Sequence, residues 1–111
     1  MLMVPRKMLV DSFTYEEFKG KGRDHNPQYA DSVTIEMARI DRQKTYGENS
    51  QEAAVRSNAT IYTFAPLTTP FLDFKEQSRV RFDGREHVIV EVRKLKHWYM
   101  DEIMAYELDV M

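Results

Sequence analysis

Residues 79 to 92 read Arg79-Val80-Arg81-Phe82-Asp83-Gly84-Arg85-Glu86-His87-Val88-Ile89-Val90-Glu91-Val92, the strongest structural signal in the chain. Asp83-Gly84 separates two runs that are rich in β-forming residues. Asp-Gly is a preferred pair for a two-residue type I′ turn, because both central residues of that turn need a positive φ. The stretch therefore predicts a β-hairpin, in which Val88, Val90 and Val92 share one face of the second strand.

The segment from Ser32 to Asp41 also alternates between apolar and polar residues, as a strand with one buried face does. The apolar residues of its first and second parts fall in opposite phases, and the change occurs at Met37-Ala38. An extra residue in one strand of a pair produces such a change. The segment therefore predicts a strand that has a bulge, or passes from one layer to another, at Met37-Ala38.

Three further segments have strand character. Asn58–Phe64 is rich in Thr, Ile, Tyr and Phe, Ala105–Val110 alternates at the end of the chain, and Met8–Phe13 is a weaker opening strand. One segment, Gln51–Ser57, leaves a short helix open, because residues before and within it occupy capping-box positions. So short a segment does not form a stable helix alone, and helix and non-helix both remain open for it.

Five or six short strands and little helix predict an all-β fold, a small antiparallel β-barrel of about six strands with long loops and at most one short helix. Closing the sheet removes exposed edges that would otherwise aggregate. A length of 111 residues and a mass of 13.2 kDa suit a single β-barrel domain over residues 1–111. Residues 1–7 and 19–31 are expected to be flexible or loop, since Lys19–Pro27 holds two of the four glycines.

The composition excludes several classes of protein. Sixteen Lys and Arg against eighteen Asp and Glu give a net charge of −2, which argues against a dedicated polyanion binder but leaves room for a local basic patch. No cysteine is present, so the chain has no disulfide, thiolate zinc site or cysteine nucleophile. The apolar start ends at Pro5, too early for a secretory signal or a membrane span, and we expect a soluble intracellular protein without membrane contact.

No residue pattern indicates catalysis. His25, His87 and His97 lie far apart in the sequence, without the spacing of metal ligands. The serines lack a Gly-x-Ser-x-Gly motif, and Gly20-Lys21-Gly22 lacks the spacing of a phosphate-binding loop. We therefore expect no enzyme activity, no catalytic residue, no bound metal and no cofactor.

The segment Arg93–Tyr99 interleaves basic and aromatic residues, and its candidate contact residues are Lys94, Lys96, His97, Trp98 and Tyr99. Such a mixture suits a protein interface, a nucleic-acid-binding surface, or a plain hairpin with one wet and one buried face, and the sequence leaves all three open. Four acids follow between Asp101 and Asp109. A basic end and an acidic end on one small domain are expected to favour head-to-tail packing of identical subunits.

Several motifs occur together in a fixed order. They are the hairpin Val80-x-Phe82-Asp83-Gly84-x-x-x-Val88-Ile89-x-x-Val92, the final Tyr106-Glu107-Leu108-Asp109-Val110, and upstream of both Ala59-Thr60-Ile61-Tyr62-Thr63-Phe64 and Thr68-Thr69-Pro70-Phe71. In order, spacing and total length, residues 30 to 111 resemble the small minor capsid, head–tail connector proteins of tailed bacteriophages and prophages. Relatives often carry His-His-aromatic-Glu before the last strand, where this chain has Met104-Ala105-Tyr106-Glu107.

The resemblance implies a structural, non-enzymatic role in the virion, after assembly in the cytoplasm of the bacterial host. Similar proteins fold as a small β-barrel and assemble as a ring between the portal or its adaptor and the tail. The implied partners are the portal or adaptor, tail-side proteins and further copies of the chain, in a ring that forms either alone or only on the portal. Burial of Trp98 and Tyr99 against a neighbour is expected to hold such a ring together.

In such a ring the loops between strands are expected to make the contacts, because loops tolerate change while the barrel holds their ends. The expected contact loops are Lys19–Gln28 and Lys94–Met100. The first adds Lys19, Lys21 and Arg23 to the candidates for contact with a partner or DNA. A basic loop that faces the central channel would touch packaged DNA transiently. The alternative function is a nucleic-acid-binding module on an OB-like barrel, which predicts aromatic rings on one exposed strand face beside Lys or Arg.

Overall fold

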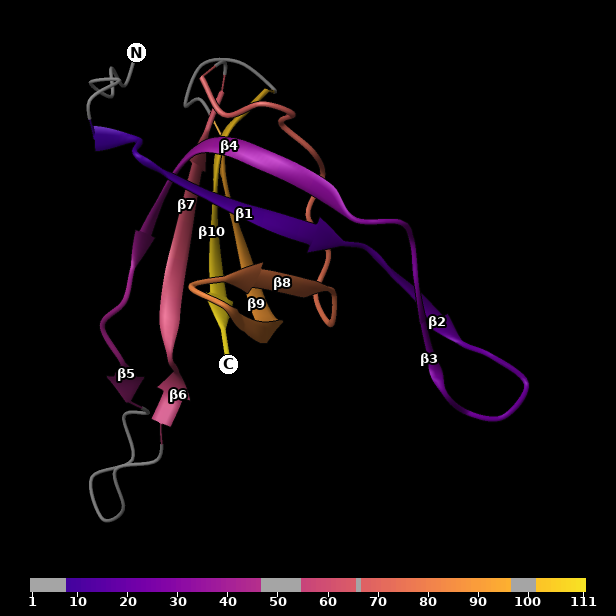
Figure 1. The fold of residues 1–111 in the computed structure, drawn as a ribbon. Helices are drawn as coiled ribbons and strands as arrows, with labels where there is room; N and C mark the ends of the chain where they lie inside the picture. The colour runs from indigo at the N-terminus through magenta and orange to yellow at the C-terminus, as the bar shows by residue number, and fades with distance from the viewer. Residues whose placement is uncertain (1–7, 47–54, 66, 97–101) are drawn as a thin grey trace.

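The computed structural model describes residues 8–46, 55–65, 67–96 and 102–111, and these residues form ten strands (Figure 1). The strands are β1 (Asp11–Glu16), β2 (Phe18–Lys21), β3 (Pro27–Tyr29), β4 (Val33–Asp41), β5 (Thr45–Tyr46), β6 (Val55–Ser57), β7 (Ala59–Phe64), β8 (Arg79–Phe82), β9 (Arg85–Lys96) and β10 (Ile103–Val110). No helix occurs among these residues, and hence none that is long and apolar enough to cross a membrane.

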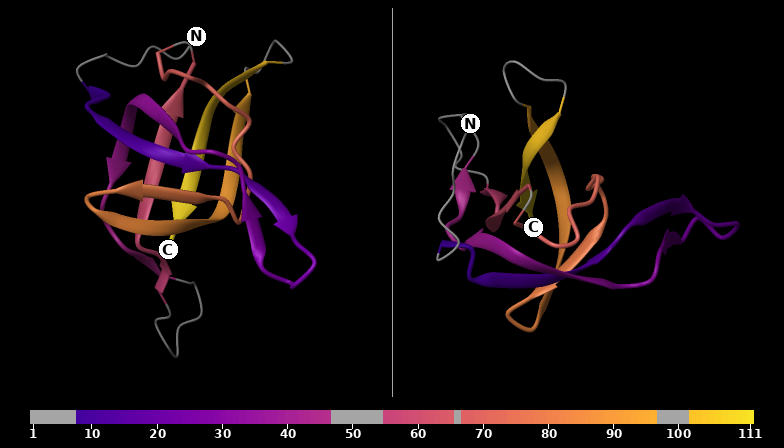
Figure 2. Two further views of the ribbon diagram at one scale, coloured as in Figure 1. Left: turned by 45° about the vertical axis from the view of Figure 1, so that its right-hand side comes forward. Right: turned by 90° about the horizontal axis from the view of Figure 1, so that it is seen from above.

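Six of the strands close into an antiparallel barrel in the order β1-β4-β7-β10-β9-β8. This confirms the all-β barrel of about six strands that the alternating segments predict. Each barrel strand has a neighbour on both sides, so the barrel sheet offers no open edge. The remaining strands form two separate ribbons, β2–β3 and β5–β6. Figures 1 and 2 show the β2–β3 ribbon extending away from the barrel.

The predicted hairpin is confirmed, with β8 and β9 joined by the two residues Asp83 and Gly84 at φ 54° and 72°. Val80 is paired with His87, so that the side chains of these two residues lie on the same face of the sheet. Ile89 therefore also points inward and is fully buried. Val88 and Val90 on the opposite face point outward and are 37% and 42% exposed. The prediction that Val92 shares this face is wrong, because a register shift between β9 and β10 pairs Val92 with the buried Leu108 and packs it against the core. The outer face of the hairpin is thus apolar as well as charged.

The predicted bulge in β4 is also confirmed. Phe13 of β1 pairs with Ile35 of β4 and Asp11 pairs with Ala38, so that β4 contains one residue more than β1 over this interval. Met37 lies at the bulge and has a φ of 61°. Thr68 donates its hydroxyl hydrogen to the Met37 carbonyl oxygen at 2.6 Å. The bulge is therefore held by the segment that follows β7.

Phe74 fills the centre of the barrel although it belongs to no strand. It is 2% exposed, and its ring centroid lies 6.1 Å from that of Phe13, 5.0 Å from that of Tyr15 and 5.4 Å from that of Tyr106. The residues that carry it, 67–78, connect β7 to β8. The Phe74 ring packs against aromatic side chains from β1 and β10, so the segment is part of the core.

Buried tyrosine hydroxyls attach this segment to the barrel. The Tyr15 hydroxyl oxygen accepts a hydrogen bond from the Lys75 backbone N–H at 3.0 Å and lies 3.3 Å from Ser78 Oγ. The Tyr106 hydroxyl donates to Asp73 Oδ1 at 3.0 Å. Burial of its ring, and then this hydrogen bond, raise the pKa of Tyr106 to about 12.

Tyr106 should make the stability of the protein sensitive to alkali. An unfolded tyrosine loses its proton near pH 10, so the stabilisation is complete below about pH 10 and is lost as the pH rises towards about 12. We expect the free energy of unfolding to fall by up to about 2–3 kcal/mol through this window, and Tyr106→Phe to remove that part of the fall. Urea unfolding at several alkaline pH values measures both slopes, and equal slopes in the two proteins would contradict the expectation.

The structure differs from the sequence predictions in three places. Much of the predicted loop 19–31 is paired in the β2–β3 ribbon, because Phe18 and Tyr29 pair at its base and their rings lie 5.9 Å apart. The opening strand begins at Asp11, later than expected for Met8–Phe13. The open helix at 51–57 is wrong for Val55–Ser57, which pair as β6 with β5. The other residues of that segment, and residues 1–7, lie outside the described residues.

Candidate functional site

The predicted contact residues fall into two groups on separate parts of the molecule (Figures 1 and 2). Lys19 and Lys21 lie on β2 and Arg23 lies in the turn that joins β2 to β3. Lys94 and Lys96 lie at the end of β9, beside the start of β10. The remaining candidates, His97, Trp98 and Tyr99, lie outside the described residues.

The first group stands on a ribbon with a rigid base. We call residues 18–29 the arm. The Phe18 backbone N–H donates to Ser78 Oγ at 2.9 Å, and the Ala30 N–H donates to the Glu17 carbonyl oxygen at 2.8 Å. The Arg79 guanidinium lies 3.8 Å from the centroid of the Tyr29 ring, a short cation–π contact. These contacts fix the direction in which the arm leaves the barrel.

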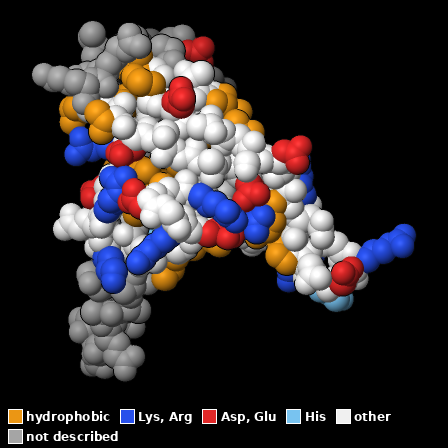
Figure 3. Space-filling model, viewed as in Figure 1, with side chains coloured by type: hydrophobic (Ala, Val, Ile, Leu, Met, Phe, Trp, Pro, Cys, Tyr) orange, Lys and Arg blue, Asp and Glu red, His pale blue; other side chains and the backbone are white. Residues whose placement is uncertain are grey.

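The positive charges of the arm are least compensated towards its tip. The Lys19 ammonium lies 2.7 Å from Glu17 Oε2, and Lys75 lies 3.2 Å from the other oxygen of the same carboxylate. Hydrogen bonds from these two lysines lower the pKa of Glu17. Lys21 and Arg23 are exposed and form no ion pair with the described residues. Figure 3 shows basic, acidic and histidine side chains together at the tip.

In the second group, Lys94 helps to hold residues 67–78, the segment that carries Asp73, against the barrel. Its ammonium nitrogen lies 3.3 Å from Asp73 Oδ1, the same atom that accepts the hydrogen bond from Tyr106. The Tyr106 hydrogen bond first, and then Lys94, lower the pKa of Asp73. Lys96 is exposed and pairs in register with Ile103 of β10. This end of the β9–β10 hairpin leads into the part of the chain outside the described residues.

The predicted separation of a basic end from an acidic end is wrong for Arg93. Its guanidinium lies 2.9 Å from Glu107 Oε2 and 2.7 Å from Asp109 Oδ2. Asp109 is 3% exposed and also accepts a hydrogen bond from the Thr60 hydroxyl at 2.9 Å. Charges that are distant in the sequence therefore meet across β9 and β10, because the antiparallel register places Glu107 opposite Arg93. Arg93 stabilises the barrel and is not available as a contact residue.

Arg93→Met should destabilise the protein, because it leaves the buried Asp109 carboxylate without its cation. Loss of one partner of a buried pair costs about 3–5 kcal/mol, and since Arg93 is itself partly exposed we expect about 2–3 kcal/mol. Arg81→Met, an exposed control on β8, should change the free energy of unfolding by less than about 0.5 kcal/mol. Adding Asp109→Asn to Arg93→Met should recover part of the loss. Urea unfolding that gave the two single variants equal stability would refute this role for Arg93.

The sequence did not indicate a cleft of about 340 Å³ beside the β8–β9 turn. Its lining includes Arg42, Lys44, Asp83, Arg85 and His87. These residues come from the end of β4 and from the hairpin, and no sequence motif joins the two segments. β1 pairs with both β4 and β8, so the proximity of these residues depends on the β1–β4 and β1–β8 registers, and only the fold reveals it.

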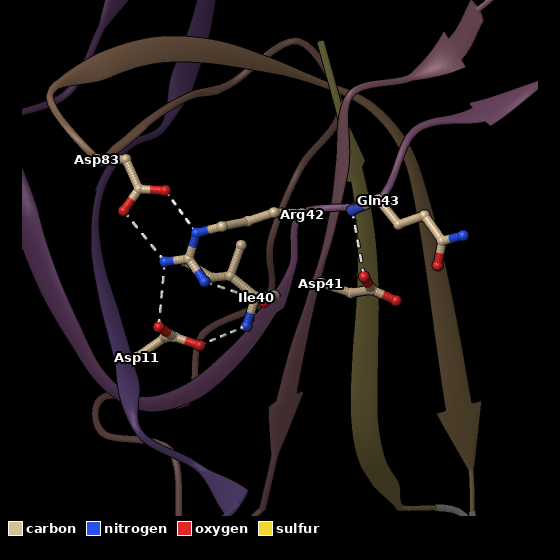
Figure 4. A network of polar contacts seen from close by, with 6 residues as sticks. All are labelled: Asp11, Ile40, Asp41, Arg42, Gln43 and Asp83. Atoms are coloured by element: carbon tan, nitrogen blue, oxygen red, sulfur yellow. Dashed lines mark hydrogen bonds and ion pairs between the residues drawn. The ribbon is translucent and has the colours of Figure 1, made fainter.

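Arg42 organises one wall of this cleft (Figure 4). Its Nε and one terminal nitrogen donate to both oxygens of Asp83, and that terminal nitrogen also donates to Asp11 Oδ1 at 3.2 Å. The other terminal nitrogen donates to the Ile40 carbonyl oxygen at 3.3 Å. These bonds raise the pKa of Arg42 and lower that of Asp83. Arg42 therefore links β1, the residues that follow β4 and the β8–β9 turn.

The described residues contain no group of three or more His, Asp or Glu placed to hold a metal ion. His87 lies in the cleft and His25 lies in the turn of the arm, so the structure does not bring these two together. Glu17 and Asp73 are held in ion pairs with Lys19 and Lys94, whereas Lys21 and Arg23 form none with the described residues. The arrangement therefore suits contacts between charged surfaces.

Comparison with known proteins gave one match. A family model described as "Minor capsid protein" matches residues 5–110, nearly the whole chain. Comparisons with curated proteins and with solved structures found no match. The matched range includes the barrel and both ribbons.

Proposed function

This chain belongs to the minor capsid protein family, structural proteins of the bacteriophage virion, and from that premise we propose that it is a head–tail connector. In this role it forms a ring between the portal or its adaptor and the tail. Its partners are then the portal or adaptor on one side, tail-side proteins on the other, and identical copies within the ring. The virion is its site of action, and the host cytoplasm is the place of assembly.

The observation that carries this proposal is the arm on a closed barrel. The barrel sheet has no open edge, so within the described residues contact with another chain would use the outer faces, the loops or the ribbons. A two-stranded ribbon is marginally stable by itself in water. Each strand of the arm also keeps one unpaired edge within the described residues. Contact with a second molecule would supply the packing that the arm lacks.

A ring supplies such a contact once per subunit. In a heterologous interface one surface of each copy meets a different surface of the next, and the contact repeats until the ring closes. The arm is the first surface, and the barrel of the next copy is the second. If the arms point into the central channel, Lys21 and Arg23 would also contact the packaged DNA.

The alternative of a nucleic-acid-binding module receives less support. A stacking surface needs aromatic rings that are open to bases. Among the described residues the large exposed apolar side chains are Met8, Val10, Val33, Val88, Val90 and Met111, and none of them is aromatic. The described outer faces therefore lack fully exposed rings, and Tyr62 on β7, the pairing partner of Arg39, is only partly exposed.

Electron microscopy of the purified protein, alone and mixed with the portal of the same phage, tests the proposal. We expect particles in which a ring of this protein is stacked on the portal. The protein alone should remain largely monomeric at modest concentration, because association has to repay the lost freedom of each subunit. Portal particles whose outline and mass stay unchanged at excess protein, together with virions that complete their tails without it, would refute the connector role.

A further inference from the structure

The cleft beside the β8–β9 turn has the charge and donor pattern of an anion site. Arg42 is compensated by Asp11 and Asp83, as described above. Lys44 and Arg85 line the same cleft, and neither forms an ion pair with the described residues. Lys44 and Arg85 are therefore two cations without ion pairs among the described residues, beside an Arg42–Asp11–Asp83 group that carries one net negative charge. Figure 3 shows blue side chains gathered over this part of the barrel.

His87 adds a third nitrogen group with a fixed direction. Its ring is half-buried and stacks on the Phe82 ring, with centroids 4.4 Å apart and an angle of 9° between the planes. Burial, and then the charge of Arg85, lower the pKa of His87, while Asp83 opposes this effect. The imidazole is then neutral near pH 7 and donates through one ring N–H. Arg42 and Lys44 face it across the cleft as further cations.

We propose that this cleft binds a phosphate group, whose oxygens take the ammonium of Lys44, the guanidinium of Arg85 and the ring N–H of His87. These groups are all donors, and phosphate offers several acceptor oxygens to them. A phosphate monoester carries about −1.5 to −2 charges near neutral pH, and it offers more acceptor oxygens to these three donors than one carboxylate does. The Asp83 carboxylate does not compete, because both of its oxygens are held by Arg42.

Phosphate groups reach a protein either as free phosphate compounds or as the backbone of a nucleic acid. The volume of about 340 Å³ lies at the lower end of small-molecule sites, and it accommodates a single phosphate-bearing unit of either source. A polynucleotide would add salt-dependent contacts outside the cleft, whereas a free compound would not. The site is independent of ring formation, so it is testable on the isolated full-length chain.

The test compares two double variants with the wild-type chain by titration calorimetry at low salt. The double variant Lys44→Gln with Arg85→Gln removes the two cations of the cleft that have no ion pair with the described residues. Lys75→Gln with Arg81→Gln removes the same charge from exposed positions outside the cleft and is the matched control. The probes are inorganic pyrophosphate, a short duplex DNA and a hexaglutamate peptide. Thermal unfolding of each variant checks that the barrel is intact.

We expect a phosphate probe to bind the wild-type chain, and its affinity to fall about tenfold or more in the cleft variant but little in the control. Binding should also raise the pKa of His87 in a proton NMR titration, so that affinity is greater at about pH 6 than at about pH 8. Tight binding of pyrophosphate assigns the site to free phosphate compounds. Binding of the duplex alone assigns it to a nucleic-acid backbone.

Three results would overturn the proposal. Hexaglutamate that binds where both phosphate probes fail would identify the cleft as a site for an acidic segment of a partner protein. Equal weakening in the cleft variant and the control would reduce the effect to general surface charge. The absence of binding by all three probes to the folded wild-type chain would show that the cleft is not an anion site.

Discussion

Phe74→Ala is expected to lower the free energy of unfolding by about 3–5 kcal/mol. The substitution removes a ring that is 2% exposed and packs against three aromatic side chains inside the barrel. The three contacting rings belong to strands fixed in the barrel sheet, which limits their movement into the space. A domain of this size loses about 4 °C of Tm for each kcal/mol, so Tm should fall by about 12–20 °C.

Phe71→Ala provides the matched control for this substitution. Phe71 comes from the same segment and its ring lies 5.3 Å from that of Tyr106, but it is only partly buried. The control should therefore cost clearly less than the loss of Phe74. Calorimetric unfolding of both variants measures the difference. Equal costs would mean that Phe74 does not fill the barrel as the structure shows.

Replacing residues 19–28 by Asn-Gly is expected to abolish assembly on the portal while the barrel stays folded. Phe18 and Tyr29 are directly paired, so a two-residue type I′ turn is able to join them without moving either. The Phe18–Ser78 bond and the Arg79–Tyr29 contact are retained, and the unfolding midpoint should change little. Removal of a principal contact surface costs about 2 kcal/mol or more, which is a loss of about 30-fold in affinity.

A second variant separates the shape of the arm from its charge. Lys21→Gln with Arg23→Gln keeps the ribbon and removes the two cations that have no ion pair with described residues. If the ribbon itself contacts a neighbouring copy, this variant should assemble far better than the shortened chain. Sedimentation of portal complexes formed by each variant gives the bound fraction. Normal assembly of the shortened chain would exclude the arm from the interface.

The parts of the fold that follow from local chemistry were predictable from the sequence. Asp83-Gly84 specifies its turn because the two residues adopt the positive φ values that a type I′ turn needs. The bulge at Met37 was visible because one extra residue inverts the alternation of buried and exposed positions. Both signals lie within a few residues, so they do not depend on how distant parts of the chain pack together.

The features that depend on tertiary register were not predictable. Phe74 lies in a segment without alternation, so nothing local distinguishes its buried ring from an exposed one. The pairing of Arg93 with Asp109 needs the β9–β10 register. The cleft needs three segments to meet. The sequence predicts a loop for residues 19–31 because this polar stretch has no apolar period, whereas backbone pairing and the Phe18–Tyr29 contact hold the arm together in the structure.

The predicted contact residues were resolved unevenly by the structure. Lys94 has a structural role beside Asp73, which the basic–aromatic pattern did not suggest. Lys21 and Arg23 remain candidates because they are exposed and form no ion pair with the described part of the chain. His97, Trp98 and Tyr99 remain predictions, since they lie outside the described residues.

Cryo-electron microscopy of the junction between head and tail in complete virions tests the central claim most directly. A closed barrel that assembles through its arm should appear there as a ring of barrels, with the β2–β3 ribbon of each copy in contact with its neighbour. Barrels located in the shell of the head, or arms that end in solvent without touching another chain, would contradict it.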